Sequence, residues 1–328
     1  MNKRQFSCNR IKFQRLCNKQ VLGLLVLCTI ALFLFSCGID RNIKKGEKFL
    51  AIGEYYDAAT EFKSAYQRTP AKNRAQRGQL AAKMALCYDQ ISLSQRAIAA
   101  YRNVIRYKQD DKDTHLKLAA NLMKTGSYPE AIKEYSIALD SMPDNDIARE
   151  GLAAATKAPT IKEQGSYYQV KKMDKFNSRR QDYSPMLFGD QYNQLYFTST
   201  RNEAQGDEIS GITGVKPGDI FVSEKDEKGK WGIPHAIESG LNSEADEGTP
   251  AFSVDGREMY ITQCLTDPTY PRFAQIAVSS RADAAWGKPK KLEITRDTLS
   301  SFAHPALSPD GNWLYFVSDM PGGKGGLD

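Results

Sequence analysis

Two series of internal repeats, which differ in period and in residue type, restrict the folds that this sequence can adopt. Repeats of fixed spacing are typical of solenoids and propellers, in which each unit buries its apolar face against the next. The first series lies between Gly53 and Ala138, and the second lies between Ser184 and Ser318. We therefore expect two domains of different class, a helical one followed by one built of strands.

The first series pairs a small residue with an aromatic residue four positions later. The spacings between successive small residues are 39 and 34 residues, and the pairs are Ala58 with Phe62, Ala97 with Tyr101 and Ala131 with Tyr135. Residues four apart lie on the same face of a helix, so each pair marks one side of a helix. Gly53 and Gly126 precede the first and third pairs and suit tight turns, whereas Ser92 stands at the matching place in the second.

This pattern resembles the tetratricopeptide repeat, whose period is about 34 residues. The resemblance implies an α-solenoid of three helix pairs over residues 37–157, closed by a terminal helix over Asp146–Thr156. The additional residues of the first spacing are expected within Ala71–Arg77.

In such a solenoid the first helix of each pair lines a groove that can hold a segment of another protein. By repeat position, the predicted partner-binding residues of the groove are Glu47 and Leu50 in the first unit, Leu86, Asp89 and Gln90 in the second, and Leu116, Met123 and Lys124 in the third. The alternative for any one of these side chains is a solvated face with no ligand.

The second series begins each time with a residue followed by proline, then a turn and an aromatic-rich strand. The dipeptides are Ser184-Pro185, Thr249-Pro250 and His304-Pro305, spaced by 65 and 55 residues, and a Trp-Gly-x-Pro element recurs at Trp231 and Trp286. Each unit is expected to form two hairpins. Turns such as Ser308-Pro309-Asp310-Gly311 use proline, aspartate and glycine for turn geometry, so Asp255 and Asp310 are expected to cap turns rather than to act in catalysis.

The turn and the strand after it resemble the TolB-type, WD40-like repeats of β-propellers over Phe176–Asp328. The resemblance implies a linker over 158–175 and an incomplete propeller over 176–328, with two blades and the start of a third. Since propellers have about four to eight blades, the sequence is expected to be an N-terminal fragment.

Residues 1–36 have the composition of an export signal. Six basic residues and no acidic ones precede the apolar run Val21–Phe35, and Leu34-Phe35-Ser36-Cys37 resembles a bacterial lipoprotein box. We expect cleavage after Ser36 and lipidation of Cys37, which would place the protein on the periplasmic face of the outer membrane. The alternative is an uncleaved anchor over Val21–Ile39, which has 19 residues and no charge.

Charge and motif content narrow the function classes. The sequence has 45 Lys and Arg against 39 Asp and Glu, and the six bases of the signal account for the excess, so the mature chain has 39 of each. A neutral chain gives no support to nucleic-acid binding.

No nucleophile elbow, phosphate loop or metal-ligand spacing occurs, so we predict no cofactor, no metal site and no enzymatic activity. Cys87 and Cys264 are expected to be separate buried side chains rather than a disulfide.

The order of lipidated cysteine, tetratricopeptide repeats and TolB-type repeats resembles Gram-negative envelope lipoproteins of the OmpA family, in particular the PorE-type components of the type IX secretion system. The resemblance implies a scaffold that binds envelope or secretion-system proteins through the groove and the propeller. Peptidoglycan would be bound only by a domain outside this sequence. The alternative is the gating region of a periplasmic peptidase of the prolyl-oligopeptidase kind, whose catalytic domain would also lie outside it.

Overall fold

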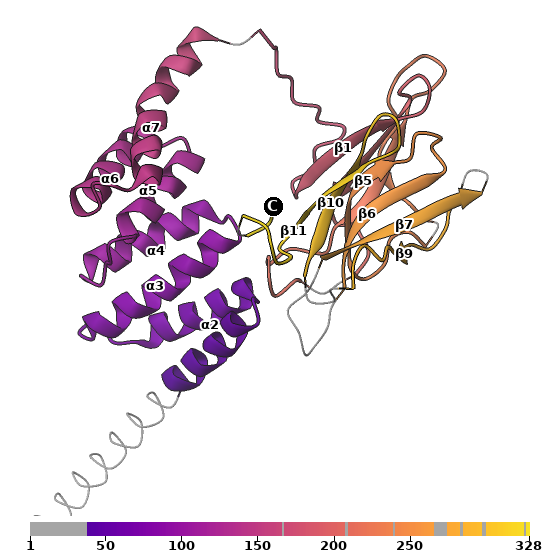
Figure 1. Ribbon diagram of the computed structural model, residues 1–328. Helices are drawn as coiled ribbons and strands as arrows, with labels where there is room; N and C mark the ends of the chain where they lie inside the picture. The colour runs from indigo at the N-terminus through magenta and orange to yellow at the C-terminus, as the bar shows by residue number, and fades with distance from the viewer. Residues whose placement is uncertain are drawn as a thin grey trace, which may run out of the picture. The chain divides into compact units, whose positions relative to one another are not determined.

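The computed structural model describes residues 38–328, apart from 166, 207–208, 239, 266–273, 283–284, 297–299 and 325. Cys37 and the predicted signal peptide lie outside the described residues. The chain divides into two compact units, Met1–Gly165 and Ser166–Asp328 (Figure 1). Within the described residues, no helix is long and apolar enough to cross a membrane.

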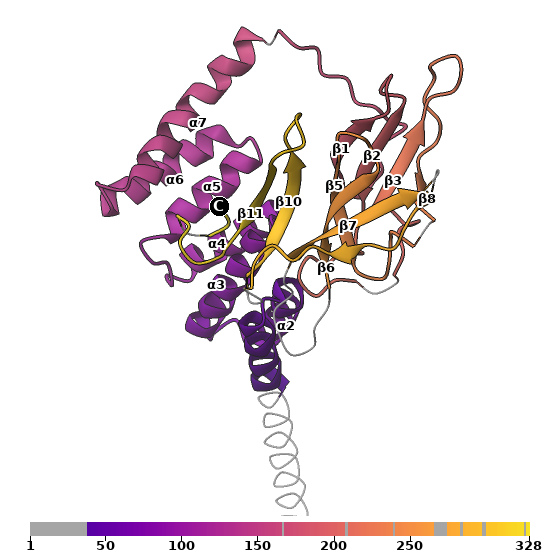
Figure 2. The same ribbon diagram turned by 45° about the vertical axis from the view of Figure 1, so that its right-hand side comes forward.

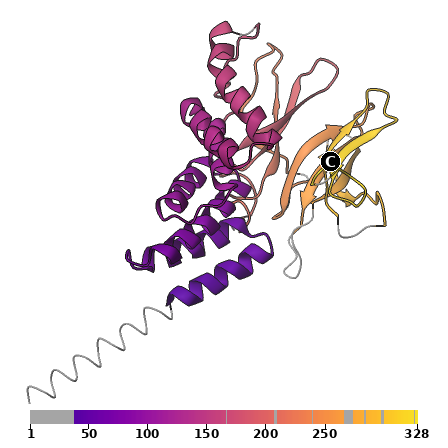
Figure 3. The same ribbon diagram turned by 60° about the vertical axis from the view of Figure 1, so that its left-hand side comes forward.

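The first unit is helical, and each helix packs on the next in chain order (Figures 1 and 3). A helix over residues 38–51 is followed by α2 (Tyr55–Arg68), α3 (Arg74–Gln90), α4 (Ser94–Arg106), α5 (Thr114–Lys124), α6 (Tyr128–Ser141) and α7 (Asp146–Gln164). The predicted arrangement of three helix pairs and a terminal helix is confirmed.

Small residues let the helices approach closely, as the repeat pattern predicts. Ala58, Ala97 and Ala131 are fully buried, and the aromatic residues four positions later are buried with them. Glycine is required at two further contacts. A Cβ atom at Gly46 would lie 2.7 Å from the ring of Phe62, and one at Gly151 would lie 2.4 Å from the ring of Tyr135.

The turns between paired helices use the left-handed region of backbone space. Gly53 has φ +78° and Gly126 has φ +74°, and Ser92, which replaces glycine in the second unit, also adopts a positive φ of 55°. The turn geometry is therefore retained without glycine, although the left-handed region costs a non-glycine residue roughly 1 kcal/mol.

The additional residues of the first spacing, expected within Ala71–Arg77, lengthen α3, which begins at Arg74 and has 17 residues, whereas α5 has 11. The terminal helix α7 continues past Thr156 and through Pro159 to Gln164, so the first residues of the predicted linker are helical. Ala148 and Ala155 of α7 are buried, whereas most later residues of the helix are exposed and show no apolar periodicity by which the sequence could reveal it.

The second unit consists of antiparallel sheets (Figure 2). The first sheet contains β1 (Asp182–Phe188), β2 (Gln194–Ser199), β3 (Asp219–Glu224) and β4 (His235–Ala236). The second contains β5 (Asp246–Phe252), β6 (Glu258–Cys264) and β7 (Ala274–Ala282), with β8 (Ala285–Trp286) and β9 (Lys290–Lys291) both paired to β7. A hairpin of β10 (Phe302–Leu307) and β11 (Leu314–Ser318) follows.

The three X-Pro dipeptides lie within β1, β5 and β10, each at a register shift in the strand pairing. The residues before proline, Ser184, Thr249 and His304, have positive φ values of 51°, 51° and 55°. Proline has no backbone N–H to donate in strand pairing, and at a bulge that hydrogen bond is not required. The bulges also join neighbouring sheets, because the backbone N–H of Thr249 donates to Thr198 Oγ1 at 3.0 Å and that of His304 donates to Thr262 Oγ1 at 2.8 Å.

The turn role predicted for two aspartates is confirmed. Asp255 Oδ1 accepts hydrogen bonds from Ser253 Oγ and from the backbone N–H of Arg257. Asp310 makes the matching contacts with Ser308 and Asn312, which lower the pKa of its carboxyl to about 2. Both carboxylates are thus occupied by their own turns.

Aromatic side chains fill the space between the first and second sheets. Tyr196 packs edge-on against Phe188 and Phe252, with ring centroids 5.9 and 4.9 Å away, and Phe252 also contacts Trp286. Because β5 packs against β1, β2 and β3, these rings join one sheet to the next.

One buried carboxylate in this unit is incompletely paired. Asp219, at the start of β3, is fully buried, and its Oδ2 accepts from the backbone N–H of Gln205 at 2.7 Å. Its Oδ1 has no hydrogen-bond partner in the described part of the chain. Burial, aided by the nearby carboxylates of Glu247 and Asp246, raises the pKa of Asp219 to about 6.

We expect Asp219→Asn to stabilise the second unit at neutral pH. The folded carboxyl holds its proton to a higher pH than the unfolded one, so the wild type loses stability as the pH rises from about 4 through 6. The neutral amide avoids this loss, keeps an acceptor for Gln205, and should add about 2 kcal/mol to the free energy of unfolding at pH 7.5. Urea unfolding of both proteins between pH 4 and 8 measures the difference.

The gain should shrink as the pH falls to about 4. The control is Asp255→Asn, where the pKa of the exposed carboxyl is lowered by its turn, so this substitution should destabilise the unit at neutral pH. A gain for Asp219→Asn that does not depend on pH would contradict the explanation.

Candidate protein-interaction groove

A cleft of about 230 Å³ opens among α3, α4 and α5 of the helical unit. Lys83 and Leu86 come from α3, Tyr101 and Val104 from α4, and Lys117 from α5; Ala82, Asp111 and Thr114 complete the lining. Tyr101 and Val104 are buried and form an apolar floor, while Leu86 is 36% exposed. This cleft is the candidate binding surface, and Leu86 is the predicted groove residue that lines it.

The charges at the cleft differ in how they are held. Asp111 Oδ1 accepts from Thr114 Oγ1 at 2.6 Å and from the backbone N–H of Asp113, and these bonds lower the pKa of Asp111. Lys83 forms an ion pair with Glu47 and lies 5.4 Å from the ring centroid of Phe62. Lys117 has no ion pair among the described residues, so its ammonium group is available to a ligand.

Asp89 and Lys124, both predicted to orient a partner, are brought together by the fold. Lys124 Nζ lies 3.4 Å from Asp89 Oδ1, which also accepts from Asn121 Nδ2 at 2.9 Å. Asp89 Oδ2 accepts from the hydroxyl of Tyr101 at 3.2 Å. Since Asn121 and Tyr101 are buried, Asp89 joins α3, α4 and α5 and has a structural role.

The other predicted groove residues contribute less open surface. Leu50, Leu116 and Met123 are half-buried and pack against the helical core. Glu47 pairs with Lys83, and Gln90 is exposed at the end of α3. The predicted lipidation site, Cys37, lies outside the described residues.

Sequence reasoning missed the two lysines of the cleft. Lys83 precedes Leu86 by three residues, so helical periodicity places it on the same face as Leu86. Lys117 directly follows Leu116, and adjacent residues do not share a helix face. Helical periodicity was the signal that could have identified Lys83. Tyr101 was assigned to the core alone, whereas it is both buried and part of the cleft floor.

The described residues contain no group of three or more His, Cys, Asp or Glu side chains that could hold a metal ion. Cys87 is buried, as predicted, whereas Cys264 is only half-buried, which differs from the prediction. His115 is half-buried on α5, where its Nδ1 lies 2.6 Å from Glu134 Oε2 of α6.

No family model and no curated protein matches the chain. Among solved structures, it is similar to the TPR domain of P58(IPK), with 19% identity, a TM-score of 0.34, and coverage of 42% of this chain and 38% of that chain. The first TPR of Spaghetti (RPAP3), bound to the HSP90 peptide SRMEEVD, has 18% identity, a TM-score of 0.32 and coverage of 38% and 95%. The Sgt2 TPR domain from Aspergillus fumigatus has 16% identity, a TM-score of 0.32 and coverage of 42% and 88%.

We expect Asp89→Ala to destabilise the helical unit by about 2 kcal/mol, because it leaves the buried hydroxyl of Tyr101 without its partner and removes a bond from Asn121. Thermal unfolding followed by circular dichroism at 222 nm measures the loss. The neighbouring Gln90→Ala, at an exposed position, should change stability by less than about 0.5 kcal/mol. Equal effects of the two substitutions would contradict the structural role of Asp89.

Proposed function

We propose that this chain is a non-enzymatic scaffold whose helical unit binds a segment of a partner protein in the cleft among α3, α4 and α5. The observation that carries the proposal is the exposed side chain of Leu86 above the apolar floor of Tyr101 and Val104. A helix face that contacts only water does not require buried apolar side chains beneath it. Grooves that hold peptides combine apolar anchors with a few charged groups at the rim.

The charged side chains at the rim of the cleft determine which partner segments can bind. Lys117 has no ion pair among the described residues, and Lys83 forms an ion pair with one carboxylate, that of Glu47. Asp111 is the acidic side chain of the cleft, and it is held by Thr114. A segment with an apolar side chain next to one or more carboxylates fits this arrangement.

The peptide SRMEEVD, which the RPAP3 domain binds, has this composition and serves as a probe. We expect the wild-type chain to bind it more tightly than the analogue SRMQQVN, in which amides replace the three acidic side chains, in fluorescence polarisation. Leu86→Ala should weaken binding about tenfold by removing an apolar anchor, and Lys117→Gln should weaken it several-fold and reduce its salt dependence.

Gln90→Ala is the matched control, because Gln90 lies on the same helix outside the cleft lining, and it should leave binding unchanged. Equal binding of the acidic peptide and its amide analogue, or full binding by a folded Leu86→Ala variant, would argue against the proposed cleft.

We further propose that the protein is held on the periplasmic face of the outer membrane by a lipid on Cys37. The support is the run of basic residues, the apolar stretch and the small residue before Cys37.

For the strand unit, we infer blades of a TolB-type propeller, supported by the 55-residue repeat, the antiparallel sheets and the repeated bulges. A lipid-anchored scaffold with two interaction units suits an envelope machine such as a secretion system of the type IX kind.

Mass spectrometry of the membrane fraction should find a diacylglyceryl-modified N-terminus at Cys37. Cys37→Ala should abolish the modification and leave the unprocessed precursor. The control is Cys28→Ala, which changes a cysteine within the apolar run and should leave processing intact. Mature protein that begins at Met1 would instead support the uncleaved anchor.

A further inference from the structure

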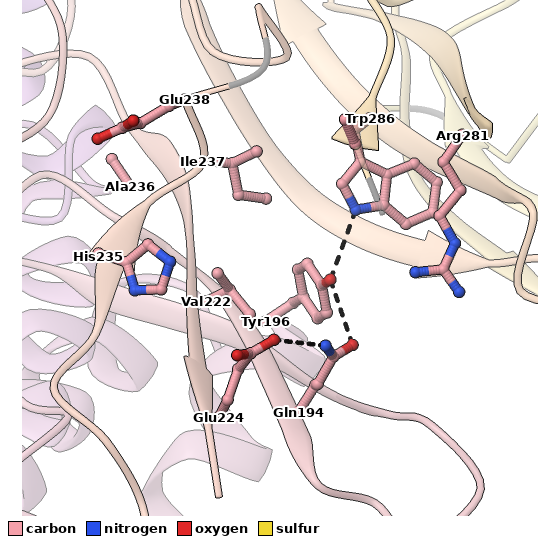
Figure 4. Close-up of a pocket in the computed structure, with 11 residues that line it drawn as sticks. Gln194, Tyr196, Val222, Glu224, His235, Ala236, Ile237, Glu238, Arg281 and Trp286 are labelled. Carbon is pink, nitrogen blue, oxygen red and sulfur yellow. Dashed lines mark hydrogen bonds between the residues drawn. The ribbon is translucent and has the colours of Figure 1, made fainter. Parts of the chain in front are cut away.

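A second cavity, of about 550 Å³, lies in the strand unit between β2, β3 and β4 of the first sheet and β7 and β8 of the second. Figure 4 shows Arg281 beside the indole of Trp286 on one side, with His235 and Glu238 on the other side and Gln194 and Glu224 below. The cavity is separate from the helical cleft and is not explained by the proposed scaffold function.

Arg281, on β7, is the unusual group of this cavity. Its guanidinium lies 4.9 Å from the ring centroid of Phe188 and 5.0 Å from that of Trp286. Among the described residues the guanidinium has no ion pair and no hydrogen bond, although the side chain is half-buried. Aromatic contact orients the cation but leaves its N–H donors free, and such a planar fork matches a carboxylate.

Four carboxylates of the described residues near Arg281 already accept hydrogen bonds from other groups. Glu224 Oε1 accepts from Gln194 Nε2 at 2.6 Å, as the dashed line in Figure 4 marks. On the other side of Arg281, Glu258 accepts from the hydroxyl of Tyr260, and Asp255 and Asp310 are held by their turns. The described residues therefore hold a cation in place without supplying its anion.

A chain of hydrogen bonds forms the wall between the two ends of the cavity. Trp286 Nε1 donates to the Tyr196 hydroxyl at 3.4 Å, and this hydroxyl donates to Gln194 Oε1 at 3.4 Å. Tyr196 and Trp286 are buried, so the wall is rigid and aromatic. At the far end Glu238 is exposed and forms no hydrogen bond or ion pair with another described residue.

We propose that this cavity binds a zwitterion, a free amino acid or a dipeptide. Its carboxylate would pair with Arg281, its ammonium would lie toward Glu224 and Glu238, and its body would pack on Trp286 and Tyr196. A ligand with only negative charge, such as a phosphate ester, fits less well because Glu224 and Glu238 line the same cavity. The volume suits a molecule of dipeptide size.

The test is isothermal titration of the purified chain with each of the twenty amino acids and with the dipeptide Ala-Phe. We expect at least one zwitterion to bind with one-to-one stoichiometry. Amidation of its carboxyl group should weaken binding at least tenfold, and so should Arg281→Gln. The two changes should not be additive, because both remove the same contact.

N-acetylation of the ligand should also weaken binding, and the double variant Glu224→Gln, Glu238→Gln should weaken the free zwitterion but not its acetylated form. Arg257→Gln is the matched control, since this exposed arginine lies outside the cavity, and it should leave binding unchanged. If Arg281→Gln unfolds, Arg281→Lys keeps the cation without the fork, and the effect of amidation on the wild type needs no variant.

Three results would overturn the proposal. They are the absence of binding by every probe, an undiminished affinity for the amidated ligand, and tighter binding of phenyl phosphate than of any zwitterion.

Discussion

A single helix pair or a single four-stranded sheet in this chain leaves an apolar face uncovered, and contact with the next repeat covers it. In the helical unit, an alanine or glycine on one helix receives an aromatic ring, as Gly46 receives Phe62 and Gly151 receives Tyr135. In the strand unit, rings such as Tyr196 and Phe252 join one sheet to the next. The stability of each unit therefore depends on its stacking, as in other repeat proteins.

Stacking also determines where polar groups can be functional. Asp89 joins three helices by accepting hydrogen bonds from Asn121 and Tyr101, so its charge is committed to the fold. Lys117 and Arg281 are the contrasting cases, because each lines a cavity without an ion pair to a described residue. A charge that the fold orients but does not neutralise marks a place where a ligand can bind.

Prediction from the sequence succeeded where the determinants are local. The small and aromatic residues at helical spacing predicted the helix pairs, and Asp310 in its Ser-Pro-Asp-Gly turn was correctly assigned to capping. It was less successful where the sequence lacks a periodic signal, as for the end of α7 beyond Thr156. Three of the predicted groove side chains, Leu50, Leu116 and Met123, pack partly against the core. The reason is that the groove-facing side of a helix passes into its core-facing side without a sharp boundary.

The sequence by itself determined the division into a helical unit and a strand unit, the repeat spacing and the turn chemistry, because each depends on residues close together in the chain. Only the tertiary structure decided which charges meet. Glu47 pairs with Lys83 of the next repeat, Asp89 bonds Asn121 across 32 residues, and Arg281 lies against Phe188 of the preceding sheet. Such contacts follow from the stacking of whole elements, and no local pattern records which side chains it brings together.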